Sequence, residues 1–219
     1  MVFVKELFDQ LEDLLEDYPP AQPADRQVSW DMKRHYLNMG QNAMWPRVHL
    51  VVQDVSTEMG DGYQEYIFPE SVRGGRLVYV EVESEPASLV YSIVAQEDYN
   101  IIPGPGRADI LKLALDAEGH NIRITTTMPL VPIVAVDDTA AASEEYSGPS
   151  YTVEGPVLYA MNRITARGLH QRLDYGRGSV NYQNRSAVPN ELMASSIFWL
   201  DEFERRVDQW QLVHPQSVA

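Results

Sequence analysis

The chain offers few residues with the types and spacing that catalysis or metal binding requires. It has no cysteine, which rules out disulfides, thiolate chemistry and cysteine-ligated zinc. A metal would have to be held by histidines and carboxylates, but no HExxH or HxH spacing is present. Each histidine is therefore interpreted as a surface or packing residue. The histidines are His35, His49, His120, His170 and His214.

Motifs for a serine nucleophile or a bound phosphate are also missing. There is no GxSxG sequence to place a serine on a strained turn. In Gly104-Pro105-Gly106 the proline removes an N–H group that a phosphate would need, so we predict a tight turn. Gly176 and Gly178 follow a predicted helix instead of a strand, which favours a helix end and a loop over a nucleotide cradle.

Carboxylates occur in adjacent pairs, at Asp137/Asp138, Glu144/Glu145 and Glu97/Asp98. A glycosidase needs two carboxylates on opposite sides of a cleft, and sequence adjacency does not supply this arrangement. No DxDxDG calcium loop is present either. The sequence therefore predicts no catalytic residues, no metal and no cofactor. A carboxylate-based hydrolase whose cleft is assembled only by the fold stays open as an alternative.

Arginines of the last third of the chain form a different kind of candidate. The first three are spaced four and five residues apart, which places them roughly on one helix face. Such a row can pair with acids of a neighbouring subunit or face a phosphate backbone. The alternative is pairing with the chain's own acidic surface. The candidates are Arg163, Arg167, Arg172, Arg177 and Arg185.

The charge balance limits the possible partners. The net charge is −15, and residues 1–150 hold 25 of the 32 acids but 10 of the 17 bases. Such a surface repels nucleic acid, so a groove-reading role is not expected. Only three of the basic residues are lysines. This composition fits either a protein that works at high salt or a gene that is rich in G and C. No apolar stretch is long enough for a bilayer span, so we expect a soluble protein without a membrane partner.

The N-terminal part is predicted to be helical. Residues 3–18 carry an apolar stripe at helical spacing with acids around the rest. Pro19 ends this acidic helix. A second helix is predicted at 29–39, with Ser29 as its N-cap and Gly40 at its end. The stripe consists of Val4, Leu7, Phe8, Leu11, Leu14, Leu15 and Tyr18.

The middle of the chain has the pattern of β-strands. The β-branched runs at 48–55, 76–83 and 89–95 each predict a strand.

The clearest local signal in this region is a hairpin. It joins 108–115 to 120–127, with Gly119 at the turn position that favours positive φ. A further edge strand is predicted at 130–136, because Pro132 cannot donate to a ladder.

The last part of the chain returns to helices. Helical spacing predicts helices at 153–174 and 190–210. The polar segments 137–150 and 174–188 contain too few apolar residues to order themselves, so we expect contacts with other chains to order them.

The C-terminal helix is expected to pack inside the subunit through one stripe and to continue into an exposed tail. The stripe consists of Leu192, Trp199, Phe203 and Val207. Trp210, Leu212 and Val213 are predicted to project as a docking tail, because the last residues carry no charge that would keep them in water. Pro215 ends any further helix.

We therefore predict an α+β protein with an N-terminal acidic helix, a β-rich middle and a C-terminal helical pair with an extended tail. The expected regions are an N-terminal helical segment at 1–46, a β-rich region at 47–136, an acidic linker at 137–152, and the helical pair with its tail at 153–219.

In outline the sequence resembles the head–tail connector, or adaptor, proteins of siphovirus-like tailed viruses, including those of haloarchaea. The resemblance is carried by the helical pair VLYAMNRITARGLHQRL and NELMASSIFWLDEFERRVDQW, the β-rich insertion with DILKLALDAEGHNIRITTT, and the short C-terminal tail. Familiar adaptors are mostly helical and smaller, so the long β section leaves the position in the virion neck open. A stopper or tail-completion protein is the alternative within this class.

The resemblance implies an assembly role in the neck of a virion put together in the host cytoplasm. It implies a ring of about twelve copies of this chain, as closed cyclic assemblies are built. The tail would dock on the portal protein, the β part would face the next neck or tail protein, and DNA would pass through an acidic lumen without sequence recognition. A monomeric host binding module is a further alternative.

Overall fold

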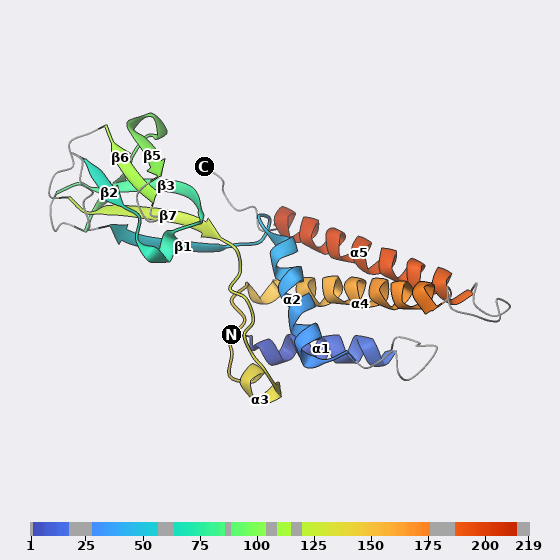
Figure 1. Cartoon of the computed structure of the whole chain (residues 1–219). Coiled ribbons are helices and arrows are strands. Elements are labelled where there is room, and N and C mark those ends of the chain that lie inside the picture. Colours follow the sequence, from blue (N-terminus) through green and yellow to red (C-terminus); the bar gives the residue numbers. More distant parts are fainter. Residues whose placement is uncertain are drawn as a thin grey trace. The chain divides into compact units, whose positions relative to one another are not determined.

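The structure is a computed structural model that describes residues 2–17, 28–56, 64–85, 89–103, 109–114, 120–175 and 187–213. The chain divides into two compact units. The helical unit comprises Met1–Val48 and Pro129–Gln216, and the β unit lies within His49–Met128. In sequence the β unit is thus an insertion into the helical unit, and the two ends of the chain, expected as separate regions, belong together. The mixed α and β composition confirms the predicted fold class (Figure 1).

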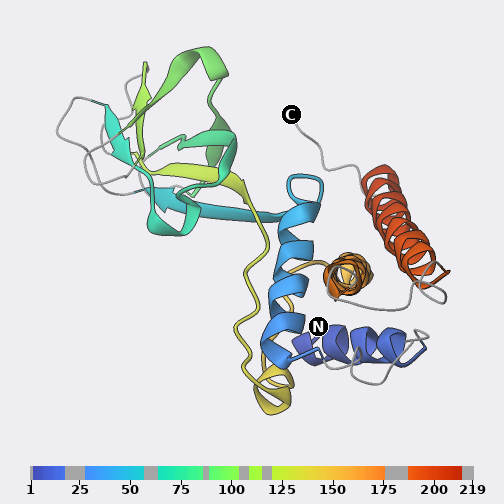
Figure 2. The same cartoon turned by 45° about the vertical axis from the view of Figure 1, so that its right-hand side comes forward.

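The helical unit is built around its longest buried helix, α4. Its elements are α1 (Val4–Asp17), α2 (Trp30–Met44), the short α3 (Asp138–Ala141), α4 (Glu154–Tyr175) and α5 (Ala187–Val213). Figure 2 looks nearly along α4 and shows α1, α2 and α5 arranged around it. The predicted apolar stripe of α1 is buried at Leu7, Phe8 and Leu11, and α5 buries Phe203 and Val207. Burial of these stripes holds the helices together.

The start of α2 was predicted correctly, and its end was not. Ser29 is the N-cap, and its side chain accepts a hydrogen bond from the backbone N–H of Met32. The helix does not end at Gly40 but continues to Met44. Gly40 is instead a contact point with α4, because a Cβ atom there would lie 2.6 Å from Pro156 Cα. Glycine is required here for close approach of two helices, and not for a turn.

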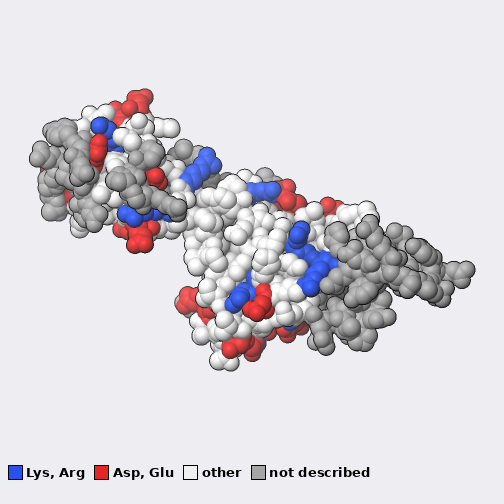
Figure 3. All heavy atoms as spheres, viewed as in Figure 1, with Lys and Arg blue, Asp and Glu red and all other residues white. Residues whose placement is uncertain are grey.

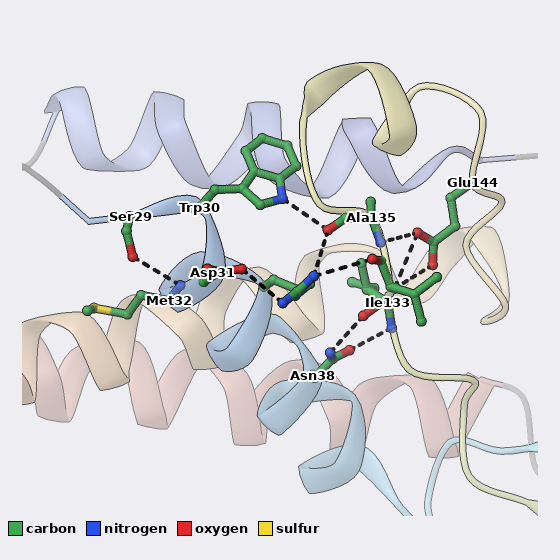
Figure 4. A network of polar contacts seen from close by, with 10 residues as sticks. Ser29, Trp30, Asp31, Met32, Asn38, Ile133, Ala135 and Glu144 are labelled. Atoms are coloured by element: carbon green, nitrogen blue, oxygen red, sulfur yellow. Dashed lines mark hydrogen bonds and ion pairs between the residues drawn. The ribbon is translucent and has the colours of Figure 1, made fainter.

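The predicted edge strand at 130–136 is wrong: the segment is extended but pairs with none of the described strands. Side chains of α2 bond its backbone instead (Figure 4). Asn38 donates to Ile133 O at 3.0 Å and accepts from Ile133 N at 2.7 Å. Trp30 Nε1 donates to Ala135 O at 3.0 Å. The prediction assumed a neighbouring strand, but here side chains of a helix bond the backbone instead.

The segment 137–150 is held by contacts within the chain, where the prediction was a linker ordered by other chains. Asp137 caps α3 by accepting from Ala140 N at 2.8 Å. The Glu144 carboxylate accepts from Ala135 N at 2.6 Å. Tyr146 is buried and its hydroxyl lies 3.0 Å from Thr152 Oγ1. Acids that the sequence suggested were solvated charges therefore serve as acceptors for backbone N–H groups. Residues 176–186 of the other predicted loop lie outside the described residues.

The β unit contains two antiparallel sheets, with strand orders β1-β7-β3-β4 and β2-β6-β5. Its core includes Tyr66, Phe68, Val80, Leu111 and Ile124. The strands are β1 (Leu50–Ser56), β2 (Glu65–Ile67), β3 (Arg76–Glu83), β4 (Tyr91–Ile93), β5 (Tyr99–Pro103), β6 (Asp109–Leu113) and β7 (Ile122–Met128).

The predicted hairpin between 108–115 and 120–127 is wrong, although both segments contain strands. β6 pairs with β2 and β5, whereas β7 pairs with β1 and β3 in the other sheet. The expected turn with Gly119 lies outside the described residues. Alternating apolar residues fit a core between two sheets as well as a hairpin, so the pattern could not distinguish the two.

Replacing Gly40 by alanine should destabilise the helical unit. The new methyl group would meet the backbone of Pro156, which cannot move aside as a flexible side chain can. We expect a loss of about 1–3 kcal/mol in the free energy of unfolding, measured by urea denaturation. Asn42→Ala, at an exposed position of the same helix, is the control and should change stability by less than about 0.5 kcal/mol. Equal stability of G40A and the wild type would contradict the close packing.

Tyr146 should make stability fall at alkaline pH. Burial raises the pKa of Tyr146 from 10.0 to about 12. Its contribution is fully present below pH 10 and is lost as the pH rises towards 12, because the unfolded chain then releases a proton that the folded chain retains. The loss is about 2–3 kcal/mol. The free energy of unfolding, measured by denaturation at a series of pH values between 10 and 12, should fall more steeply with pH for the wild type than for Tyr146→Phe. Equal pH dependence of the two proteins would disprove the assignment.

Candidate docking surface

Contacts between α4 and α5 fix the rotation of α5 about its axis. Asn162 Nδ2 on α4 donates to Ser196 O at 2.7 Å and lies 3.0 Å from Ser196 Oγ. Farther along, the rings of Tyr159 and Phe203 meet edge to face with centroids 5.2 Å apart. The stripe of α5 that faces α4 therefore runs through Ser196, Phe203 and Val207. Residues on either side of this stripe form two separate flanks of the helix.

One flank of α5 borders a groove with α1 and α4. The groove has a volume of about 420 Å³. Its apolar lining consists of Leu14, Val157, Leu158, Phe198 and Trp199. Its polar lining consists of Gln10, Asp13, Glu154, Glu202 and Arg206. An apolar floor with charged groups on the rim is the form that a docking groove for a helix or ridge takes.

The rim of this groove keeps its negative charge. Arg206 forms ion pairs with Glu154 at 3.3 Å and with Glu202 at 3.2 Å. Hydrogen bonds from Arg205, which has the larger effect, and from Arg206 lower the pKa of the Glu202 carboxyl below its ordinary value. Asp13 adds an exposed carboxylate from α1. Three carboxylates thus share the groove lining with one guanidinium, which favours a basic partner.

The other flank of α5 exposes an apolar ridge. Met193, Ile197 and Leu200 are spaced four and three residues apart, so their side chains lie along one line. All three are exposed, with Ile197 at 50%. We call these three residues the α5 ridge. Helical spacing carries this signal in the sequence, but the predicted stripe followed the side that faces α4 and did not include Ile197 and Phe198.

The structure describes the side chains of two of the five predicted arginines, and these two have different surroundings. Arg163 is exposed on α4, one residue beyond the Asn162 that contacts α5. Arg167 is half-buried and donates to Met32 Sδ of α2, so part of its hydrogen-bonding capacity is used within the chain. Arg172 belongs to α4, but its side chain, like Arg177 and Arg185, lies outside the described part of the structure. Figure 3 shows acidic side chains along the edge where Figure 1 draws α1 and α3, and basic ones nearer the middle of the helical unit.

The prediction that Trp210 projects in a docking tail is wrong. Trp210 is only 8% exposed. Its ring meets Tyr151 with centroids 6.5 Å apart, and a Cβ atom at Gly155 would lie 3.0 Å from the indole. α5 continues to Val213, so the chain is helical where an extended tail was expected. The side chains of Leu212 and Val213 lie outside the described residues, and their docking role stays a prediction.

The β unit exposes apolar residues at the edge strand β4. Leu89, Val90 and Ile93 are all exposed. Leu89 has a φ of 57°, which is uncommon for a residue with a side chain. Its N–H donates to Glu83 Oε1 at 2.9 Å, and Glu83 itself is 1% exposed. A buried carboxylate thus holds a strained backbone that displays a leucine to solvent.

No protein-family model matches the chain, and no curated protein matches its sequence. Within the described ranges, no three His, Asp or Glu side chains are grouped so that they could hold a metal ion. The helices in those ranges include none with the length and apolarity to cross a bilayer.

Replacing Trp210 by alanine should destabilise the helical unit, because the indole fills space against α4 and Tyr151. We expect a loss of about 3–5 kcal/mol in unfolding free energy, measured by thermal and urea denaturation. Gln209→Ala, at the exposed neighbouring position, is the matched control and should leave stability unchanged. A W210A chain as stable as the wild type that loses only its binding to other proteins would restore the tail-docking prediction.

Proposed function

We propose that the chain is a structural subunit of a virion neck, a head–tail connector that forms a ring between the portal and the tail of a tailed virus. The observation that carries the proposal is that each of its two units exposes apolar side chains on regular secondary structure. In the helical unit these are Met193, Ile197 and Phe198, and in the β unit it is Ile93 of β4. Exposed apolar residues on well-ordered elements favour a protein that works by contact.

The order of the elements supports this class of protein. Helices α1, α2, α4 and α5 belong to one unit, and the β unit is inserted between α2 and α3. Such a chain can use the helical unit for ring contacts and the inserted unit for another component of the neck. The edge strand β4, with Ile93 exposed, is the candidate surface for the downstream neck or tail protein. Leu212 and Val213 are the candidates for the portal contact. A stopper or tail-completion protein of the same neck is the alternative.

The charge of the chain fits a ring through which DNA moves. With a net charge of −15, the subunit repels phosphates, so DNA can pass without binding. In this role Arg163 serves contacts between subunits rather than contacts with DNA. The ring would contain about twelve copies, in keeping with closed cyclic symmetry.

The proposal predicts assembly of the purified chain into closed rings. Mass photometry and native mass spectrometry, at low and at high salt, should give one dominant species. Its mass should be an integer multiple of the 24.8 kDa subunit, corresponding to about twelve copies. Negative-stain images should show an open centre. A chain that stays monomeric over the whole range of salt and protein concentration would overturn the connector proposal and favour a monomeric binding module.

A further inference from the structure

We propose that neighbouring copies join by a specific contact, in which the α5 ridge and Arg163 of one copy enter the groove between α1, α4 and α5 of the next. This inference rests on the proposed ring and names the surfaces that would form it. Both surfaces belong to the helical unit, so the contact needs no part of the β unit. The occupant of the groove is a second copy of this chain.

The sizes of the two surfaces match. The two ends of the ridge, Met193 and Leu200, lie seven residues apart, which is about two helical turns or roughly 10 Å of helix. The ends of the groove lining on α5, Phe198 and Arg206, lie eight residues apart, again about two turns. The ridge offers branched and flexible aliphatic side chains, and the groove offers an aliphatic and aromatic floor. Contact between them would remove both exposed apolar surfaces from water.

Charge complementarity favours a second copy as the occupant. The groove lining holds three carboxylates, of Asp13, Glu154 and Glu202, against the single Arg206. Arg163 brings an exposed positive charge on the same side of the α4–α5 pair as the ridge. A nucleic acid would be repelled by the acidic rim, whereas an apolar ridge beside a guanidinium is matched by an apolar floor beside carboxylates.

The position of the two surfaces determines the kind of assembly. Phe198, Glu202 and Arg206 follow each other at intervals of four and lie on the flank that faces α1. The ridge lies on the opposite flank, across the stripe that contacts α4. Arg163 is also turned away from the groove, because Leu158 and Glu154 occupy the other side of α4. Ridge and groove are different surfaces of one subunit, so the contact is head to tail. Repetition of such a contact gives a closed ring when the rotation between neighbours divides a full turn, and an open filament otherwise.

The first test replaces one ridge residue by an acid. Ile197→Asp places a carboxylate in the acidic groove and should weaken assembly by about tenfold or more, measured by mass photometry over a dilution series. Val51→Asp makes a similar chemical change at a residue of the β unit that is 64% exposed, and should assemble as the wild type does. Circular dichroism on both variants shows whether the fold is retained. Equal assembly of I197D and the wild type would overturn this contact while the ring stands.

The second test exchanges the charges. Arg163→Glu and Asp13→Arg are each expected to assemble poorly alone, because each places like charges together at every contact. Mixed in equal amounts they should assemble again, because every contact between alternating copies then joins opposite charges. Failure of the mixture, with both variants folded, would overturn the pairing of Arg163 with the groove. A wild type that remains monomeric would overturn both the contact and the proposed ring.

Discussion

Gly40 has only a hydrogen atom where other residues carry a side chain, and this lets α2 lie directly against the start of α4. A Cβ atom would come within 2.6 Å of the Pro156 backbone. The position of α2 then determines what lies on its other side. From α2, Asn38 and Trp30 reach the extended segment 130–136 and bond its peptide groups. One close helix contact thus supports the path of a segment that leads into α3 and α4.

The extended segment shows how a backbone can satisfy its polar groups without a sheet. Asn38 has a donor and an acceptor on one amide, so it imitates the pair of hydrogen bonds that a neighbouring strand would make with Ile133. Glu144, from the turn after α3, accepts from the N–H groups of Val134 and Ala135. The hydrogen-bond partners of this backbone are thus side chains and not a second strand. Side chains of the segment that point away from the helical unit, such as Val134, remain exposed to water. The same principle appears in the β unit, where the buried Glu83 accepts from Leu89 N.

Local patterns in the sequence predicted α1, α2, α4 and α5 and most of the strands. They did not predict β2 and β5, and they did not show which segments become neighbours. The stripe of α1 and the cap at Ser29 depend on interactions within a few residues, and both were predictable. The pairing of β6 and β7 with strands of different sheets depends on distant segments, and alternation along 108–127 carries no information about them. For the candidate surface, Arg163 was identified from helical spacing, whereas the groove brings together α1, α4 and α5, which lie far apart in the sequence. Trp210 was misjudged because its uncharged surroundings resembled a tail, although its spacing from Phe203 and Val207 continues the buried stripe.

The pairing of β1 with β7 places the two ends of the insertion side by side. Leu50 is the register partner of Met128, so the chain enters and leaves the β unit at adjacent positions, about 5 Å apart as in any antiparallel pair. For the helical unit, the 80 residues of His49–Met128 are therefore equivalent to a tight connection between α2 and the segment that follows. Once the β unit has folded, the entropy lost in bringing α4 to α2 is that of a short loop and not of a long one. An insertion of this form can change in length, sequence or binding partner without altering the distance that the helical unit must close.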